Sequence, residues 1–157
     1  MFMNPVICTL EVNKGEACRR VLGELPQWFG NPAALENYVR EVEELPAFGS
    51  YVQDKLVGFA SLMHHTRDHT ELHVMGVSPA FHRMGIGRKL VEHLAEAARR
   101  YGAVYLSVKT LSSASPDTFY ARTRAFYVSC GFTDFEEFPT LWGSHAPCLM
   151  MMRLLRG

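Results

Sequence analysis

Two glycines and two arginines lie close together where an apolar stretch of the chain gives way to a helical pattern. The segment is His82-Arg-Met-Gly-Ile-Gly-Arg88. Gly85 and Gly87 let a ligand approach the backbone closely, while Arg83, Arg88 and the positive end of the following helix favour negative charge. These residue types at this spacing predict a binding site for a phosphate or pyrophosphate group.

Two common phosphate-binding motifs do not fit the segment. The Walker loop requires a Gly-Lys-Ser/Thr ending, which is absent here. The dinucleotide fingerprint requires a third glycine where Leu90 stands, and Tyr105–Val108, about 20 residues further on, offers no acid for a ribose. The remaining alternative to an anion site is an ordinary strand-to-helix turn with surface arginines.

Two motifs of the chain resemble those of the GNAT superfamily of acetyl-CoA-dependent N-acetyltransferases. His82-Arg-Met-Gly-Ile-Gly87 is similar to the Gln/Arg-x-x-Gly-x-Gly/Ala motif, with His82 where Gln or Arg is usual. Phe126-Tyr-Val-Ser-Cys-Gly-Phe132 is similar to the later Phe-Tyr-x-x-x-Gly-Phe motif. The resemblance implies an α/β fold with a mixed, mostly antiparallel central sheet flanked by helices, and the activity of an acyltransferase enzyme.

The resemblance also implies which residues bind acetyl-CoA, the acyl donor. The pyrophosphate would rest on backbone amides of the glycine-rich turn, and the pantetheine arm would pair with the backbone of the preceding strand. The cofactor-binding residues expected on this basis are Met75, Val77, Arg83, Met84, Gly85, Ile86, Gly87, Arg88 and Tyr120, where Tyr120 replaces an Asn frequent in the family. No metal ion is implied.

Three side chains are candidates for proton transfer. Tyr127 matches the family tyrosine that commonly protonates the coenzyme sulfur, and Glu71 occupies the strand position of the general-base glutamate in the histone-modifying branch. His73 is a second candidate base, because alternate residues of a regular strand share one face. A desolvated glutamate would have its pKa raised towards the useful range. Three alternatives stay open: Tyr127 packs with Phe126 and Phe119, Glu71 and His73 are polar strand-end groups, or the amine arrives deprotonated.

The acceptor side is predicted from the elements that commonly cover it in the resembling family, namely the first two helices and the last hairpin. The expected acceptor-binding residues are Trp28, Phe29, His73 and Trp142, with Tyr38 as a further pocket wall and core packing as the alternative. Glu36, Glu41 and Glu43 are local carboxylates that could bind one amine. We expect a small-molecule amine; the alternatives are a protein or peptide N-acetyltransferase and a non-catalytic acyl-CoA sensor.

Three histidines, His65, His69 and His73, recur every four residues. On a helix, that spacing places metal ligands on the same face. The segment Thr66–Thr70, however, has the composition of a loop entering a strand. We therefore predict a solvated loop without a metal. The pair His64-His65 could instead border the acceptor pocket.

Length and composition limit the remaining possibilities. A chain of 157 residues, nearly half of them apolar, predicts one domain over residues 1–157. Sixteen basic and sixteen acidic residues cancel, so attraction to nucleic acid or an anionic membrane is not indicated. The four cysteines lack Cys-x-x-Cys spacing and no segment has the pattern of a signal or membrane-spanning helix, which favours the cytoplasm. Homodimerisation through the last hairpin or a sheet edge stays open.

The elements that must position these residues follow from hydrophobic periodicity and turn signals. Asn31 is expected to cap a helix that has Pro32 in its first turn. The predicted strands are Val6–Val12, Phe48–Gln53, Leu56–His64, Glu71–Val77, Ala103–Val108, Thr133–Phe138 and Leu149–Leu154, with a hairpin turn at Asp54-Lys55. The predicted helices are Glu16–Glu24, Pro32–Leu45, Gly85–Tyr101 and Asp117–Ser129.

Overall fold

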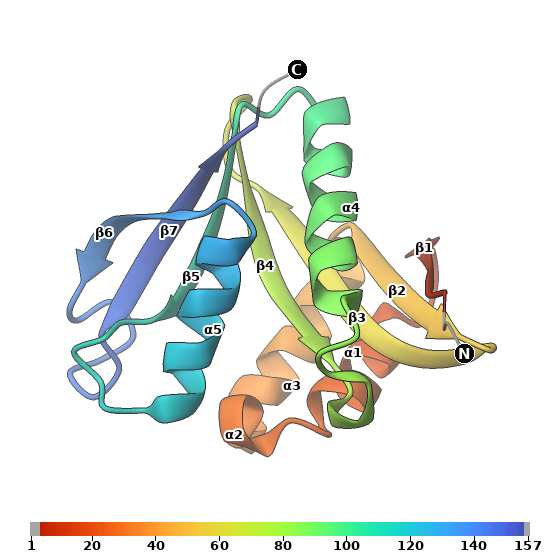
Figure 1. Cartoon of the computed structure of the whole chain (residues 1–157), viewed down its shortest axis with the longest axis horizontal. Helices are drawn as coiled ribbons and strands as arrows, with labels where there is room; N and C mark the ends of the chain where they lie inside the picture. Colours follow the sequence, from red (N-terminus) through yellow and green to blue (C-terminus); the bar gives the residue numbers. More distant parts are fainter. Residues whose placement is uncertain (1–3, 156–157) are drawn as a thin grey trace. The chain divides into compact units, whose positions relative to one another are not determined.

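A computed structural model describes residues 4–155 (Figure 1). The seven strands form one sheet in the order β1-β2-β3-β4-β5-β7-β6. Of the pairings with a known register, β4–β5 is parallel and the other four are antiparallel. The predicted α/β class with a mixed, mostly antiparallel sheet is confirmed.

The chain divides into two compact units, each described by itself below. The first unit comprises the chain up to Met63 together with His73–Ala97, and the second comprises His64–Leu72 together with the chain from Ala98 onward. Strand β4 therefore contributes residues to both units. The expectation of one domain over the whole chain stays a prediction.

The first unit contains the amino-terminal strands and most of the helices. Its elements are β1 (Val6–Leu10), α1 (Lys14–Leu22), α2 (Pro26–Phe29), α3 (Pro32–Glu41), the 3-10 helix η1 (Val42–Glu44), β2 (Ala47–Val52), β3 (Lys55–His64), the second half of β4 (His69–Val77), the 3-10 helix η2 (Pro79–Phe81) and most of α4 (Ile86–Arg100). Figure 1 shows α1 to α3 on one face of β2 and β3 and α4 on the other.

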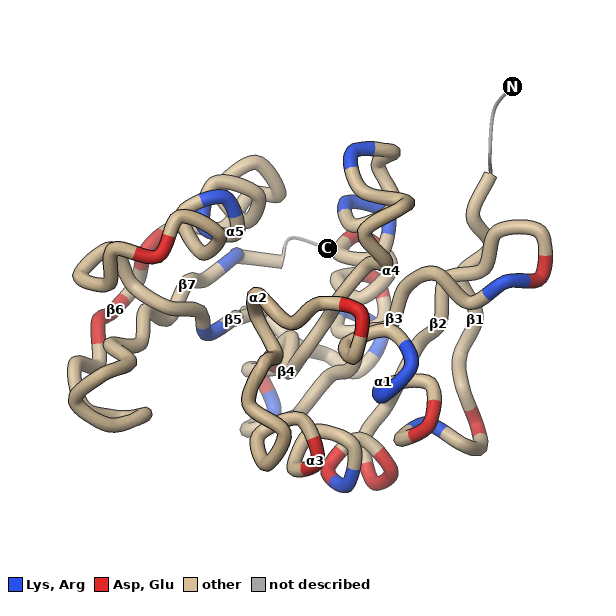
Figure 2. The backbone as a smooth tube through the Cα atoms, turned by 90° about the horizontal axis from the view of Figure 1, so that it is seen from below, with Lys and Arg blue, Asp and Glu red and all other residues tan. Residues whose placement is uncertain are grey.

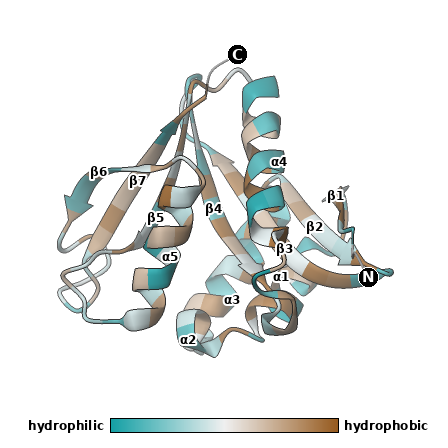
Figure 3. Cartoon of the chain, viewed as in Figure 1, coloured by the Kyte–Doolittle hydropathy of each residue, from teal (hydrophilic) through white to brown (hydrophobic). Residues whose placement is uncertain are grey.

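The core of this unit forms because its helices bury one apolar stripe each. Residues of α1 and α3 pack with strand residues such as Phe59 and Val74. On α4, Ile86, Leu90 and Leu94 are at most 2% exposed, at the four-residue spacing of one helix face. Figure 3 shows hydrophilic and hydrophobic residues interspersed along α4, as expected for a helix with one buried side.

The second unit is a smaller sheet with one helix beside it. It contains the start of β4, β5 (Tyr105–Leu111), α5 (Thr118–Ser129), β6 (Thr133–Phe138) and β7 (Cys148–Leu154). Strand β5 pairs in parallel with β4 from His69↔Tyr105 to Leu72↔Val108, and antiparallel with the whole of β7. In Figure 2, α3 carries both acidic and basic residues, whereas β6 carries acidic residues only.

Most predicted elements are confirmed, and the differences have local causes. The helix predicted at 85–101 is Ile86–Arg100, and the Asn31 side chain accepts hydrogen bonds from the amides of Ala33 and Ala34, as a cap should. The four-residue helix α2 was not predicted, because so short a segment has no measurable periodicity.

The β2–β3 turn lies one residue earlier than predicted. Its central residues are Gln53 and Asp54, with φ of 49° and 67°, whereas the sequence pattern suggested Asp54 and Lys55. Two consecutive positive φ values are typical of the type I′ turns that suit two-residue hairpins. Without a glycine, this turn had no sequence signal to fix its position.

No helix between residues 4 and 155 is both long enough and apolar enough to cross a membrane.

Candidate active site

The glycine-rich turn connects the end of β4 to the start of α4 within the first unit. Two residues of this turn have left-handed backbone conformations, Arg83 with φ 63° and Gly85 with φ 80°. The carbonyl of Gly85 accepts the first helical hydrogen bond, from the Lys89 amide at 3.1 Å. Left-handed residues in such turns are typical of backbone concavities whose N–H groups bind anions.

His82, the departure from the family motif, holds the turn against the end of the strand. Its Nε2 lies 2.6 Å from the carbonyl oxygen of Val77, so Nε2 carries the proton and donates. The ring also packs edge-on against Trp28, with centroids 6.4 Å apart. The imidazole is therefore a structural support of the turn.

The turn has room for a ligand at Gly85. A Cβ atom built on Gly85 would find no atom within 4 Å, and the neighbouring Met84 side chain is exposed. The next residue, Ile86, is buried and anchors the helix. Open space beside a rigidly anchored, glycine-containing turn fits the approach of a pyrophosphate to the backbone.

The second unit contains Glu71, which is buried and bound on both oxygens. Its side chain is only 6% exposed, and Lys109 Nζ lies 3.1 Å from each carboxylate oxygen. His65 Nε2 lies 2.6 Å from Glu71 Oε1. Glu71 is largely withdrawn from water and belongs to an ion-paired cluster, so it is not an isolated carboxylate.

His65 was not among the predicted catalytic residues, and the tight β3–β4 connection brings it into this cluster. The rings of His65 and His69 stack with centroids 4.9 Å apart. A short turn therefore brings these two rings together, although the segment between them is not a helix. Only the turn geometry could have revealed this, since the loop composition carries no such signal.

Two other histidines near His65, His64 and His69, also have hydrogen-bond partners. His69 Nε2 lies 2.7 Å from the Ser107 hydroxyl, and His64 Nδ1 lies 2.7 Å from the Thr70 hydroxyl. Burial, with the neighbouring charge of His65, lowers the pKa of both His64 and His69. Between residues 4 and 155, no group of three or more His, Cys, Asp or Glu side chains is placed to hold a metal ion.

His73 belongs to the first unit and has different partners from Glu71. Its ring packs edge-on against Tyr38 at 5.5 Å, and its Nε2 is buried 3.5 Å from Glu41 Oε1 without forming a hydrogen bond. Although strand alternation places Glu71 and His73 on one face, the structure brings each into a separate cluster. Phe29 extends the His73 cluster by an edge contact to Tyr38 at 5.9 Å.

The three acidic residues suggested as amine ligands differ in the groups that they contact. The Arg19 guanidinium hydrogen-bonds Glu36 and lowers the pKa of that carboxyl, and Glu43 accepts a hydrogen bond from the Gly15 amide at 2.6 Å. Glu41 is the member of this set that lies beside a predicted acceptor residue, His73. Trp28 packs against the core of the first unit, whereas Trp142 is 44% exposed in the β6–β7 connection.

Helix α5 carries the two tyrosines of the predicted site. Asp117 caps the helix by accepting hydrogen bonds from the amides of Phe119 and Tyr120. Tyr127 is buried, and its ring contacts those of Phe126 and Phe132 at 5.3 and 5.5 Å. Phe126 is half-buried, whereas Tyr127 is buried.

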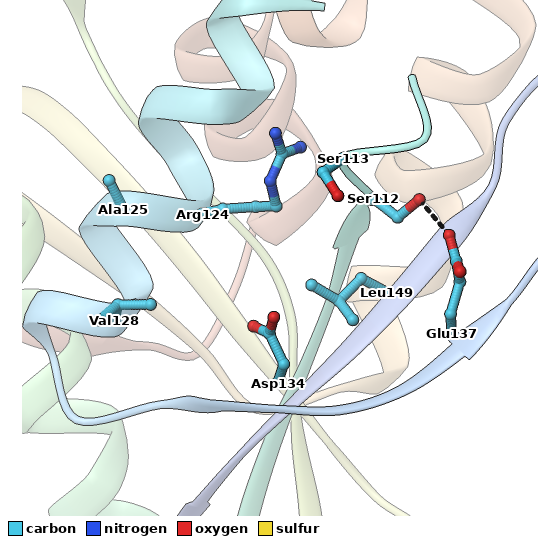
Figure 4. Close-up of a pocket in the computed structure, with 8 residues that line it drawn as sticks. All are labelled: Ser112, Ser113, Arg124, Ala125, Val128, Asp134, Glu137 and Leu149. Atoms are coloured by element: carbon cyan, nitrogen blue, oxygen red, sulfur yellow. Dashed lines mark hydrogen bonds between the residues drawn. The ribbon is translucent and has the colours of Figure 1, made fainter. Parts of the chain in front are cut away.

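A cavity of about 320 Å³ in the second unit contains none of the predicted site residues (Figure 4). Its lining residues are Ser112, Ser113, Arg124, Ala125, Val128, Asp134, Glu137 and Leu149. Ser112 donates a hydrogen bond to Glu137 at 2.5 Å, and Arg124 donates one to the Leu111 carbonyl at 2.7 Å. Ser112 and Arg124 thus have hydrogen-bond partners within the second unit.

A model of the acetyltransferase (GNAT) family matches residues 22–132. The chain belongs to this family. GNAT proteins are acyltransferase enzymes, so the resemblance inferred from the two motifs is confirmed. The matched region contains the glycine-rich turn, Glu71 and the Phe-Tyr-x-x-x-Gly-Phe motif.

Individual relatives agree with the GNAT assignment. N-alpha-acetyltransferase RimI of Mycobacterium tuberculosis is 39% identical over 80 residues, which are 49% of this chain and 45% of that protein. The chain thus matches less than half the length of this relative. A GNAT structure from Desulfovibrio desulfuricans superposes with a TM-score of 0.85 at 18% identity, covering 98% of this chain and 100% of that one. An aminoglycoside 6'-N-acetyltransferase solved with coenzyme A has a TM-score of 0.76 at 18% identity, covering 97% and 98%.

Proposed function

We propose that this protein transfers an acetyl group from acetyl-CoA to the primary amine of a small molecule by direct attack. Membership of the GNAT family supports the reaction class. The observation that carries the proposal is the turn with left-handed Arg83 and Gly85, which leaves open space beside its backbone. When bound, acetyl-CoA supplies an activated thioester.

The donor would be held mainly by backbone groups. We assign its pyrophosphate to the turn from Arg83 to Arg88, with the two arginines adding positive charge. The backbone of Met75 and Val77 would hold the pantetheine arm, and Tyr120 would contact the cofactor from α5. Amides do not depend on side-chain identity, so His82 in place of Gln or Arg is compatible with this role.

Two residues of the second unit would manage the protons. Glu71 promotes the loss of a proton from the acceptor amine, and Lys109 fixes both oxygens of that carboxylate in position. Tyr127 donates a proton to the departing sulfur. Its burial against Phe126 and Phe132 restricts the ring to one orientation, which favours directed transfer.

The acceptor would contact Trp28, Phe29, His73 and Trp142. The row of rings formed by Phe29, Tyr38 and His73 offers an apolar wall, and the Glu41 carboxylate at its end can pair with an ammonium group. A formal net charge of zero favours a small amine over a polycationic protein segment. A cytoplasmic location and a homodimer fit this role and stay predictions.

A second candidate function is acetylation of protein amino termini. The 39% identity to N-alpha-acetyltransferase RimI over 80 residues favours it. A sensor that binds acyl-CoA without turnover is the alternative of a different class. The three functions differ in whether, and with which amine, free coenzyme A is released.

The experiment is acetyl-CoA binding by calorimetry, followed by a thiol-release assay with small amines and amino-terminal peptides. We expect binding, and release that requires a small amine. Gly87→Glu should abolish binding by bulk and charge, while Gly102→Glu, just after α4 where a built Cβ meets no atom within 4 Å, is the matched control. Release with peptides alone would replace the small-molecule assignment by the second candidate. Binding without release from any amine would support the sensor, and absence of binding would refute the proposal.

A further inference from the structure

Two side chains contact the Glu71 carboxylate, Lys109 and His65. The proposed function uses Lys109 to position Glu71 and gives His65 no role. Its side chain is 33% exposed, whereas that of Glu71 is 6% exposed. The 2.6 Å contact between His65 Nε2 and Glu71 Oε1 is among the shortest of the second unit. A histidine held by a buried carboxylate is the arrangement that orients a general base in many hydrolytic and transfer enzymes.

The hydrogen bond determines the tautomer of His65. An ionised carboxylate can only accept, so Nε2 must carry the hydrogen that it donates to Glu71. In the neutral ring, Nδ1 is then the nitrogen with the free lone pair. Nδ1 is consequently the atom of this pair that can take a proton without breaking the hydrogen bond.

Glu71 is less suited than His65 to accept the proton itself. Both of its oxygens are bound by Lys109 at 3.1 Å, and Oε1 also by His65. Protonating Glu71 would leave a partly buried ammonium group without its counter-ion, which is costly. Protonating His65 instead leaves the Glu71 carboxylate paired with Lys109 and places the imidazolium beside it.

We propose that Glu71 acts through His65, whose Nδ1 accepts the proton of the attacking amine directly or through one water molecule. This inference rests on the proposed transferase function. The amine nitrogen forms its bond to the acetyl carbon and gives one proton to Nδ1, while the carbon–sulfur bond breaks and Tyr127 donates a proton to the sulfur. His65 then releases its proton to solvent, and Tyr127 regains one from solvent.

The surroundings of His65 support a defined orientation. His69 stacks on the ring and is itself held by Ser107. The titratable and charged groups near the ring are Glu71 and His69 on β4, His64 at the end of β3, and Lys109 on β5 through Glu71. Arg67 and Asp68 lie in the same turn, are exposed and pair with each other. The exposed third of the side chain provides a path for the proton to water.

The test compares two histidine variants with the same substitution. His65→Gln retains an N–H donor for Glu71 but has no nitrogen that can be protonated near neutral pH. We expect kcat to fall about 100-fold, acetyl-CoA affinity to change less than about twofold, and the acid limb of the kcat/KM pH profile to disappear. His145→Gln, at an exposed histidine of the β6–β7 connection, is the control and should retain wild-type activity and profile.

A second variant distinguishes a catalytic role of His65 from a structural one. His65→Ala should be rescued in part by added imidazole, which a purely structural role would not allow. If His65→Gln keeps the wild-type rate and pH profile while Glu71→Gln is inactive, Glu71 is the base by itself and the inference is refuted while the proposed function stands. If the wild-type protein releases no thiol with any amine, the proposed function fails and the inference with it.

Discussion

Lys109 Nζ lies 3.1 Å from both carboxylate oxygens of Glu71, joining the parallel strands β5 and β4 through an ion pair that is largely withdrawn from water. Because each charge compensates the other, this pair makes the burial of Glu71 tolerable. Loss of either partner should therefore lower stability whether or not Glu71 takes part in catalysis.

Replacing Lys109 by Met should destabilise the protein. The change leaves the buried Glu71 carboxylate without its cation, which costs about 3 kcal/mol, at the low end for buried pairs because Lys109 is 23% exposed. Urea unfolding measures the free energy, and Lys109→Arg is the control that keeps the charge. The double variant Glu71→Gln with Lys109→Met should recover part of the loss. An unchanged unfolding free energy in Lys109→Met would contradict the pairing.

Gly85→Ala should weaken acetyl-CoA binding beyond its effect on stability. Gly85 has φ 80°, so a Cβ costs about 1 kcal/mol of backbone strain and also occupies the open space assigned to the pyrophosphate. Gly102→Ala is a matched control, because Gly102 has φ 96° and equally open surroundings. Thermal unfolding should show similar losses for both variants, and calorimetry should show weaker binding for Gly85→Ala alone. Equal affinities would remove Gly85 from the donor site.

Tyr127→Phe should slow turnover while preserving the donor site. The substitution removes the phenolic proton but keeps the ring that packs against Phe126 and Phe132. We expect kcat to fall about 100-fold with acetyl-CoA affinity nearly unchanged, measured by thiol release and calorimetry. Tyr105→Phe, at an exposed position, serves as the control. Undiminished kcat would exclude Tyr127 as the acid.

The four cysteines should differ sharply in reactivity. Burial raises the pKa of Cys18 to about 12 and that of Cys148 to about 11, so both stay protonated and unreactive at pH 8. Cys130 is buried and Cys8 is exposed. We expect a disulfide reagent to modify one thiol rapidly in the native protein and four in guanidinium. Cys8→Ser should lose the rapid phase, and two rapid thiols in the wild type would contradict the burial pattern.

Stability should fall as the solution becomes mildly acidic. The pKa values of His64 and His69 are lowered in the folded protein, mainly by burial, from the ordinary value of 6.5. The unfolded chain therefore binds more protons, so the contribution is complete above about pH 6.5 and is lost as the pH falls through the lowered values. Urea midpoints at about pH 7.5 and 5.5 measure this difference. The double variant His64→Asn with His69→Asn should reduce it, and an unchanged difference would assign the effect to other groups.

Local signals predicted the elements that position the glycine-rich turn. The apolar stripe of α4 and the Asn31 cap with Pro32 are encoded within a few residues, so each was found to within one residue or at its stated position. The turn at Gln53-Asp54 and the helix α2 were not, because neither carries a glycine signal or a measurable period.

The partners of Glu71 could not be predicted from neighbouring residues in the sequence. Strand alternation suggested one face for Glu71 and His73, but Lys109 is 38 residues from Glu71 in the chain and His65 reaches it across a turn. Pairings of this kind depend on strand register and turn geometry, which composition does not encode.

The sequence by itself determined the family, the α/β class and the glycine-rich turn, because motifs, periodicity and caps are properties of neighbouring residues. The tertiary structure alone decided that Glu71 is shared by Lys109 and His65, that His82 supports the turn and that Tyr127 is buried. These contacts join residues from different elements, and their geometry exists only after the strands have paired and the helices have packed.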